Sequence, residues 1–121
     1  MIKKLKSSSI LKMASPYRIM RLLLFFDLPM VTKEERRVYA KFRKYLINNG
    51  FSMLQFSVYA KIFPNRTALV QYTQGLKRNM PIKGSIRIMA VTEKQYERME
   101  ILVGGKTIQE EVITEETLVI L

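Results

Sequence analysis

The chain has 121 residues and a hydrophobic content of 48%, which indicates one folded domain rather than a disordered segment. It carries a net charge of +11 and contains neither histidine nor cysteine. Disulfides, cysteine nucleophiles and thiolate zinc sites are therefore excluded, and so is the usual general base of enzymes. Any hydrolytic chemistry would have to use carboxylates, a hard metal ion, or both.

The positive charge is unevenly distributed. Residues 109–121 contain four glutamates and no Lys or Arg, so residues 1–108 hold 21 basic side chains against 6 acidic ones. A field of this sign favours a polyanion, and we expect nucleic acid rather than an acidic membrane surface. No segment has the roughly 18–20 apolar residues of a membrane span, and the basic start lacks the pattern of a secretion signal. We therefore expect a cytoplasmic protein.

The first 27 residues combine an extension and a strand. Residues 1–15 are basic and serine-rich, and we expect a flexible extension there, with the folded domain over residues 16–121. Residues 17–27 contain the most hydrophobic run of the chain. A run that is apolar on both faces predicts a central strand of a sheet. Asp27, the only aspartate of the sequence, stands where this strand leaves the core.

A helix is predicted next. Thr32 and Glu35 have the spacing of a capping box, so the helix should begin there and run to about Asn49. Gly50 then permits the left-handed turn that ends a helix. Apolar residues at helical spacing predict the buried stripe. This stripe comprises Val38, Phe42, Tyr45 and Leu46.

The opposite side of this helix is basic. No acid alternates with its Lys and Arg residues after Glu35, so ion pairs within this face are not expected. A basic helix face is usually just solvated, but an unpaired one also suits contact with nucleic-acid phosphates, without reading of the bases. We predict phosphate contacts at Lys33, Arg36, Arg37 and Lys41, with weaker candidates at Lys77, Arg78, Lys83 and Lys106.

The remaining elements complete the predicted fold. Alternation over residues 51–63 predicts one long strand, and further strands are expected at residues 86–91, 101–103 and 117–121. A second helix is expected at 66–79, and a short surface helix from Thr92 to about Glu100. This order indicates an α+β, ferredoxin-like split βαβ fold with an antiparallel sheet and helices on one face. Because the sheet is apolar on both sides, its other face predicts a partner, most simply a second copy in a symmetric homodimer.

Asp27 admits two interpretations. An acid directly before Leu28 and Pro29 is commonly a turn or cap residue. Alternatively, two copies of Asp27 facing each other across a dimer axis could hold one Mg²⁺ or Mn²⁺ ion, which prefer carboxylate oxygens. Gln55, Ser57 and Tyr59 alternate with apolar residues, which predicts a hydrogen-bonded partner interface or, as the sharper alternative, a lining of a phosphate site beside Asp27.

Several short strings carry a likeness to a known family. They are Phe26-Asp27-Leu28-Pro29, Glu35-Arg36-Arg37, Gly50-Phe51, Gln55-Phe56-Ser57-Val58-Tyr59 and Val91-Thr92-Glu93-Lys94-Gln95-Tyr96. With these strings in this order and spacing, residues 17–121 resemble the Cas2 family, the smaller of the two proteins of CRISPR spacer acquisition. The first and last strings most resemble members from type II-A systems.

The resemblance implies a ferredoxin-like homodimer with a C-terminal strand that crosses to the neighbouring subunit or completes its sheet. Leu118, Val119 and Ile120 would lie at that interface. The resemblance also places the family's proposed magnesium-binding aspartate at Asp27, with at most one ion per dimer. In this family the aspartate is proposed to support cleavage of RNA or DNA.

The family's integration role implies a second function. The dimer would bridge two dimers of the larger integrase, Cas1, and would hold the middle of the double-stranded prespacer during strand transfer into the CRISPR repeat DNA. Two functions thus stay open, an architectural DNA-binding subunit whose nuclease activity is dispensable and a magnesium-dependent endonuclease. A toxin-like interferase is a third, weaker interpretation.

Overall fold

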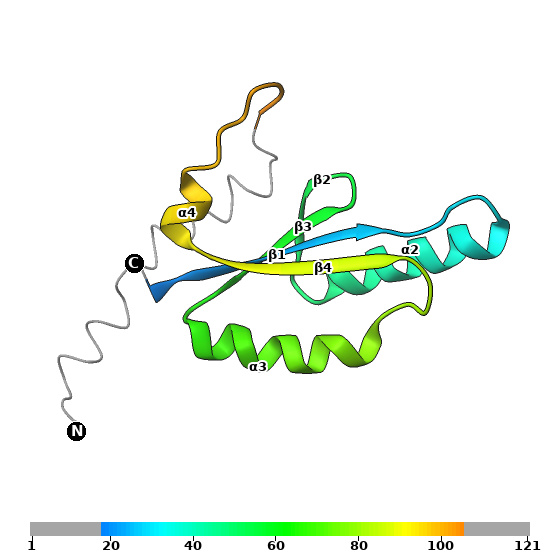
Figure 1. Cartoon of the computed structure of the whole chain (residues 1–121), viewed down its shortest axis with the longest axis horizontal. Coiled ribbons are helices and arrows are strands. Elements are labelled where there is room, and N and C mark those ends of the chain that lie inside the picture. The colour runs from blue at the N-terminus through cyan, green and yellow to red at the C-terminus, as the bar shows by residue number, and fades with distance from the viewer. Residues whose placement is uncertain (1–17, 106–121) are drawn as a thin grey trace.

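The computed structural model describes residues 18–105 as one α+β, ferredoxin-like domain (Figure 1). Its four strands form an antiparallel sheet in the order β2-β3-β1-β4, and helices α2 and α3 pack against one face. The elements are β1 (Met20–Asp27), α2 (Lys33–Asn48), β2 (Ser52–Gln55), β3 (Val58–Phe63), α3 (Arg66–Leu76) with a 3₁₀ turn (Lys77–Asn79), β4 (Ser85–Thr92) and α4 (Glu93–Glu97).

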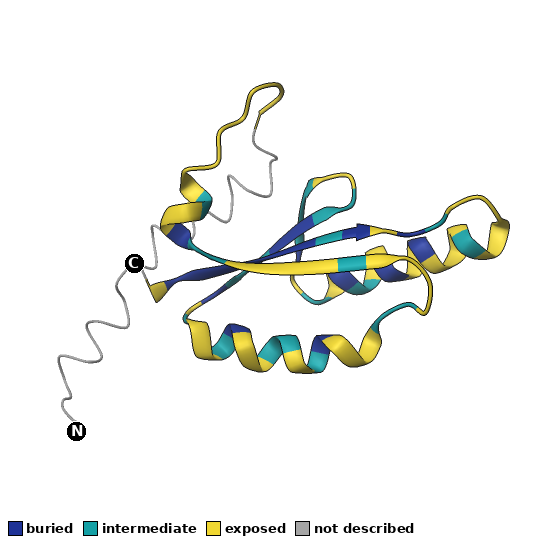
Figure 2. Cartoon of the chain, viewed as in Figure 1, coloured by how far each residue is buried: buried dark blue, intermediate teal, exposed yellow. Residues whose placement is uncertain are grey.

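Strand β1 lies at the centre of the sheet, as predicted. It pairs with β3 on one side and with β4 on the other. Its even-numbered residues from Met20 to Phe26 join the core beneath the helices. Its odd-numbered residues from Arg21 to Asp27 face the opposite side, because side chains alternate along a strand. Figure 2 shows β1 as the most continuously buried strand.

Phe26 lies within a cluster of aromatic rings in the core. Its ring lies 5.1 Å from Phe42 in an edge-on arrangement, 5.4 Å from Tyr39 and 5.7 Å from Tyr59, measured between centroids. Each such aromatic pair contributes roughly 0.5–1.5 kcal/mol beyond the burial of its apolar area. These aromatic contacts therefore hold the backbone immediately before Asp27 in place.

Helix α2 follows its predicted ends. The side chain of Thr32 accepts from Glu35 N, Glu35 reaches back to the Thr32 backbone, and Gly50 has a φ of +88°. The predicted buried stripe is confirmed at Phe42 and Leu46, whereas Val38 is exposed, Tyr45 is only partly buried, and Tyr39 is buried instead. Tyr39 is buried because its ring contacts the rings of Phe26 and Phe56. The helical spacing of apolar residues alone does not predict these contacts.

The prediction of a single strand over residues 51–63 is wrong. The chain turns at Phe56 and Ser57, so β2 and β3 form a hairpin. Ser57 adopts a φ of +69°, and its carbonyl accepts a hydrogen bond of 3.0 Å from Phe26 N. Neither Gly nor Pro marks this turn, and the apolar alternation continues through it, so the usual hairpin signal is missing.

The prediction of a strand at residues 101–103 is also wrong, since the structure has no strand there. The fourth strand of the fold is β4, because residues 51–63 supply two strands rather than one. The expected extension over residues 1–15 and the expected strand at 117–121 lie outside the described residues. Within residues 18–105, no helix has both the length and the apolar character needed to span a membrane.

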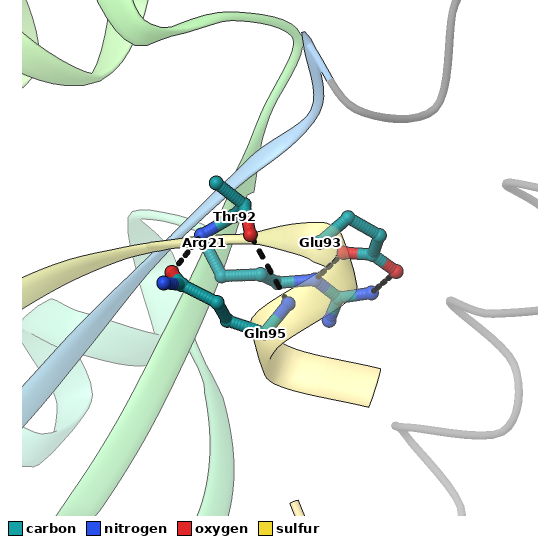
Figure 3. A network of polar contacts seen from close by, with 4 residues as sticks. All are labelled: Arg21, Thr92, Glu93 and Gln95. Atoms are coloured by element: carbon teal, nitrogen blue, oxygen red, sulfur yellow. Dashed lines mark hydrogen bonds and ion pairs between the residues drawn. The ribbon is translucent and has the colours of Figure 1, made fainter. Parts of the chain in front are cut away.

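Helix α4 is held to the sheet by a buried ion pair, so the expectation of a helix lying entirely at the surface is wrong at Glu93. Arg21 Nε and Nη2 donate to Glu93 Oε1 and Oε2 at 2.7 and 3.0 Å (Figure 3). The Arg21 guanidinium also lies 4.2 Å from the centroid of the Tyr96 ring. Thr92 and Gln95 form a second capping box at the start of α4.

The second face of the sheet has no helix over it at the Asp27 end, within the described residues. In register, Leu23 lies between Ala60 and Met89, and Phe25 lies opposite Arg87 on the β4 side. Met89 is 51% exposed. The face is therefore apolar and partly open, which is the property from which a homodimer was predicted; the dimer itself stays a prediction.

Candidate metal and nucleic-acid site

Asp27 is the last residue of β1 and lies opposite Ser85 of β4. Its side chain is exposed and stands on the face of the sheet that α2 and α3 do not cover. Within residues 18–105, no hydrogen bond or ion pair involves its carboxylate, and no cluster of three or more acidic side chains surrounds it. The donor set of one chain thus fits only part of a magnesium site, which needs several oxygen ligands.

The backbone around Asp27 is held by a close approach of Gly84. A Cβ atom on Gly84 would lie 2.8 Å from the Asp27 carbonyl oxygen and 2.6 Å from Leu28 Cδ2. Gly84 also has a φ of +102°, which side chains rarely permit. The residue before β4 therefore has to be glycine if the end of β1 is to keep its position.

The β2–β3 hairpin tip lies next to the end of β1. Ser57 is fixed there by its bond from Phe26 N and by a contact of 3.3 Å between its hydroxyl and that of Tyr39. The adjoining Gln55 is exposed. The Ser57 backbone thus adjoins the end of β1, but its hydroxyl contacts Tyr39 on the helix side of the sheet, whereas the Asp27 carboxylate stands on the opposite face. A phosphate site lined by Ser57 beside Asp27 stays a prediction.

Tyr59 lies elsewhere. Its side chain is completely buried between the sheet and the helices, so it has no exposed area to offer to a partner. Burial raises the pKa of the Tyr59 hydroxyl, and the positive charge of Arg43 opposes that shift. Leu118, Val119 and Ile120, the other predicted interface residues, lie outside the described residues.

Two of the four main predicted phosphate contacts are already engaged within the chain. Arg36 Nη1 donates to the carbonyl oxygens of Val31 at 2.7 Å and Met30 at 3.4 Å, so this guanidinium braces the loop between β1 and α2. Arg37 pairs with Glu34 at 3.1 Å. That pair is exposed, and such pairs contribute only about 0–1 kcal/mol, so Arg37 can still exchange its partner for a phosphate.

Lys33 and Lys41 are exposed on α2. Lys41 also borders a cavity of about 610 Å³ between α2 and the segment that joins α3 to β4, and Lys83 borders the same cavity. The fold thus brings Lys83 and Lys41 to the border of one cavity, although they are far apart in the sequence. Lys77 and Arg78 lie exposed on the 3₁₀ turn that leads into this segment, and Lys106 lies outside the described residues.

Glu35 lies at the start of α2 and interacts electrostatically with Lys83. Its carboxylate accepts hydrogen bonds of 3.0 Å from the backbone amides of Thr32 and Val31. The Thr32 amide is the main reason why the pKa of Glu35 lies below its usual value, and the charge of Lys83 contributes in the same direction. Glu35 is therefore a structural acid rather than a second metal ligand.

Arg87 is a basic residue that the sequence argument missed. It lies opposite Phe25, two positions along β4 from the partner of Asp27, and is exposed. By strand alternation it shares the uncovered face with Asp27. The alternation of β4 was recognised from the sequence, but the register that places Arg87 near Asp27 depends on tertiary pairing.

Comparison with known proteins identifies relatives of the chain. The family described as "CRISPR associated protein Cas2" matches residues 20–99. A Treponema denticola protein is 47% identical over 103 residues, covering 84% of this chain and 100% of its own. One from Streptococcus mutans is 51% identical over 87 residues, covering 72% and 80%. One from Ligilactobacillus salivarius is 41% identical over 101 residues, covering 84% and 100%.

All three relatives carry the name CRISPR-associated endoribonuclease Cas2. The matches in Streptococcus mutans and Ligilactobacillus salivarius are consistent with the resemblance to type II-A members.

Proposed function

The chain belongs to the Cas2 family of CRISPR-associated proteins, and we propose that it is a subunit of spacer acquisition that holds duplex DNA. As a homodimer it bridges two dimers of the integrase Cas1 and grips the prespacer through its phosphates while the integrase joins the ends to CRISPR repeat DNA. The observation that carries this proposal is the exposure of three lysines, Lys33 and Lys41 on α2 and Lys83 in the segment before β4.

The chemistry of this surface supports duplex binding without sequence preference. Lysine side chains contact phosphates as point charges and do not read base edges in a fixed geometry. If a dimer neutralises about six phosphates, the logarithm of its affinity falls with the logarithm of salt concentration at a slope near −5. Each contact that is removed reduces the slope by about 0.9.

Salt-dependent duplex binding tests the proposal. We expect the triple variant Lys33→Ala, Lys41→Ala, Lys83→Ala to bind a short duplex more weakly and with a shallower salt slope. The matched control is Arg66→Ala, Lys94→Ala, Arg98→Ala, which removes the same charge from exposed positions nearer the other end of the sheet. Equal losses in both triple variants would indicate attraction by net charge alone and would contradict a defined binding surface.

The uncovered face of the sheet supports the homodimer. Met89 on this face and Val70 on α3 are exposed to similar degrees, 51% and 44%, so they form a matched pair. In a symmetric dimer built on the uncovered face, Met89→Glu would place a charge in the buried interface, whereas Val70→Glu would not. Sedimentation of the two variants tests this arrangement, and a dimer that tolerates Met89→Glu would contradict it.

A second candidate function is metal-dependent cleavage of RNA or DNA. It is favoured by the names of the relatives and by the unpaired, exposed carboxylate of Asp27. Two copies of Asp27 fit a Mg²⁺ or Mn²⁺ ion at the dimer axis, and the ion would activate water and offset the charge that develops on the phosphate. Asp27 would hold the ion, Gly84 would keep Asp27 in position, and Arg87 would attract the phosphate.

Asp27→Asn provides the test of this second function. The substitution keeps the shape of the side chain and removes its charge, so folding and dimerisation should be unchanged. Magnesium-dependent cleavage of single-stranded RNA should be lost if Asp27 holds the ion. Cleavage that persists in Asp27→Asn at the wild-type rate would assign it to another site or to a contaminant.

A further inference from the structure

The tip of the β2–β3 hairpin presents an aromatic ring to solvent. Phe56 is 69% exposed, although phenylalanine side chains are normally buried. One face of its ring stacks on Tyr39, with centroids 5.5 Å apart and an interplanar angle of 20°. Tyr39 in turn packs against Phe26 in the core. The exposed ring therefore rests on a rigid aromatic support.

The orientation of the ring is fixed by the backbone that carries it. Ser57 has a positive φ of 69°, which a residue other than glycine adopts only when its surroundings impose it. Those surroundings are the bond from Phe26 N to Ser57 O and the contact between the Ser57 and Tyr39 hydroxyls. The tip is thus attached both to β1 and to α2. Little ordering would remain for a ligand to impose on Phe56.

Two arginines of α2 flank Tyr39, the residue that supports this ring. Arg36 and Arg43 stand three residues before and four residues after Tyr39 on α2, so both lie on the same side of the helix as Tyr39. Both are exposed. The bonds of Arg36 to the Met30 and Val31 carbonyls orient its guanidinium without neutralising its charge. An open aromatic face supported by a helix that carries positive charge is suited to bind a base together with its phosphate.

We propose that Phe56 is a stacking platform for one unpaired nucleobase at the end of β1. The proposal rests on the proposed function that the protein binds nucleic acid, and it adds a preference for substrates with single-stranded nucleotides at the β2–β3 hairpin tip. Phe56 stacks on α2, on the helix side of the sheet. It is therefore separate from the uncovered face on which the homodimer is proposed, so a second copy would leave the ring open.

Three substitutions at Phe56 separate stacking from simple apolar contact. Phe56→Ala removes the ring, Phe56→Leu keeps an apolar side chain without a π-face, and Phe56→Tyr keeps the stacking surface. Each is compared with the wild-type protein on a fully paired duplex and on a duplex of the same length with unpaired ends. Thermal unfolding of each variant checks that the domain remains folded.

We expect Phe56→Ala and Phe56→Leu to bind the duplex with unpaired ends about 5- to 150-fold more weakly, with the paired duplex unaffected and Phe56→Tyr unchanged on both. Wild-type affinity of Phe56→Leu for unpaired ends would overturn the inference, as would an equal loss on both substrates. A wild-type protein that binds unpaired ends in a Phe56-dependent manner but does not bind the paired duplex would contradict the proposed duplex function and support the inference.

Discussion

The charged residues at the two ends of strand β1 differ in burial and in pairing. Arg21 and Asp27 lie on the same face of the strand, by alternation. Arg21 is almost completely buried, is bonded at two points to Glu93, and contacts the ring of Tyr96. Asp27 is exposed, and none of residues 18–105 pairs with its carboxylate. The charge of Arg21 is thus paired within the chain, whereas the charge of Asp27 is available to a ligand.

This difference separates structural from functional charge. A buried ion pair has to satisfy itself within the chain, because each ion costs several kcal/mol to remove from water. At the Asp27 end, the packing of Phe26 and the close approach of Gly84 fix the backbone but leave the carboxylate open. Precise positioning without an internal partner is what a ligand-binding group requires.

The largest loss of stability should follow from breaking the buried ion pair between Arg21 and Glu93. Glu93→Ala leaves the Arg21 guanidinium buried without its carboxylate, so the free energy of unfolding should fall by about 3–5 kcal/mol. Asp27→Ala should change it by less than about 0.5 kcal/mol, because an exposed, unpaired group contributes little. Chemical denaturation of both variants measures the difference. Similar losses in the two variants would remove the distinction between the two ends.

An intermediate effect should follow from disturbing the support of Asp27. Gly84→Ala places a Cβ atom against the Asp27 backbone and forces a side chain into a positive φ, which should cost about 1–3 kcal/mol. The matched control is Gly75→Ala in α3, where the added Cβ meets nothing within 4 Å. There the helix should gain roughly 0.5–1 kcal/mol. A neutral Gly84→Ala variant would show that the end of β1 is less constrained than the geometry indicates.

The smallest effect concerns pH and the start of α2. Folding lowers the pKa of Glu35 below its usual value of 4.5. The charged carboxylate therefore stabilises the fold at pH values above 4.5, and this stabilisation is lost as the pH falls through the lower pKa of the folded state. Glu35→Gln keeps a capping acceptor but does not titrate. The melting temperature of the variant should therefore decrease less on acidification than that of the wild type. Parallel acid profiles would contradict this role.

Local patterns predicted much of this fold. The capping box of Thr32 and Glu35 gave the start of α2, and the apolar run gave β1 as a central strand. The β2–β3 turn could not be predicted, because Phe56 is not a typical turn residue, neither Gly nor Pro marks the turn, and contacts with Tyr39 and Phe26 hold it. The missed turn and the strand expected at residues 101–103 made the predicted order of elements wrong, although the predicted fold class is confirmed.

The candidate site was predictable only in part. Asp27 could be selected because it is the only aspartate, and Lys33 and Lys41 because they belong to a basic helix face. The proximity of Lys83 and of Gly84 to this region depends on how the segment before β4 packs, which no local period encodes. The engagement of Arg36 by the Met30 and Val31 carbonyls likewise appears only in three dimensions.

Reconstituted spacer integration tests the central claim most directly. The claim is that spacer integration requires the basic surface and does not require Asp27. Purified protein is combined with the integrase Cas1, a prespacer duplex and CRISPR repeat DNA. The wild type is compared with Asp27→Ala and with the triple alanine variant of Lys33, Lys41 and Lys83. Wild-type integration with Asp27→Ala and loss with the triple variant is the predicted result. Loss with Asp27→Ala alone would contradict the account.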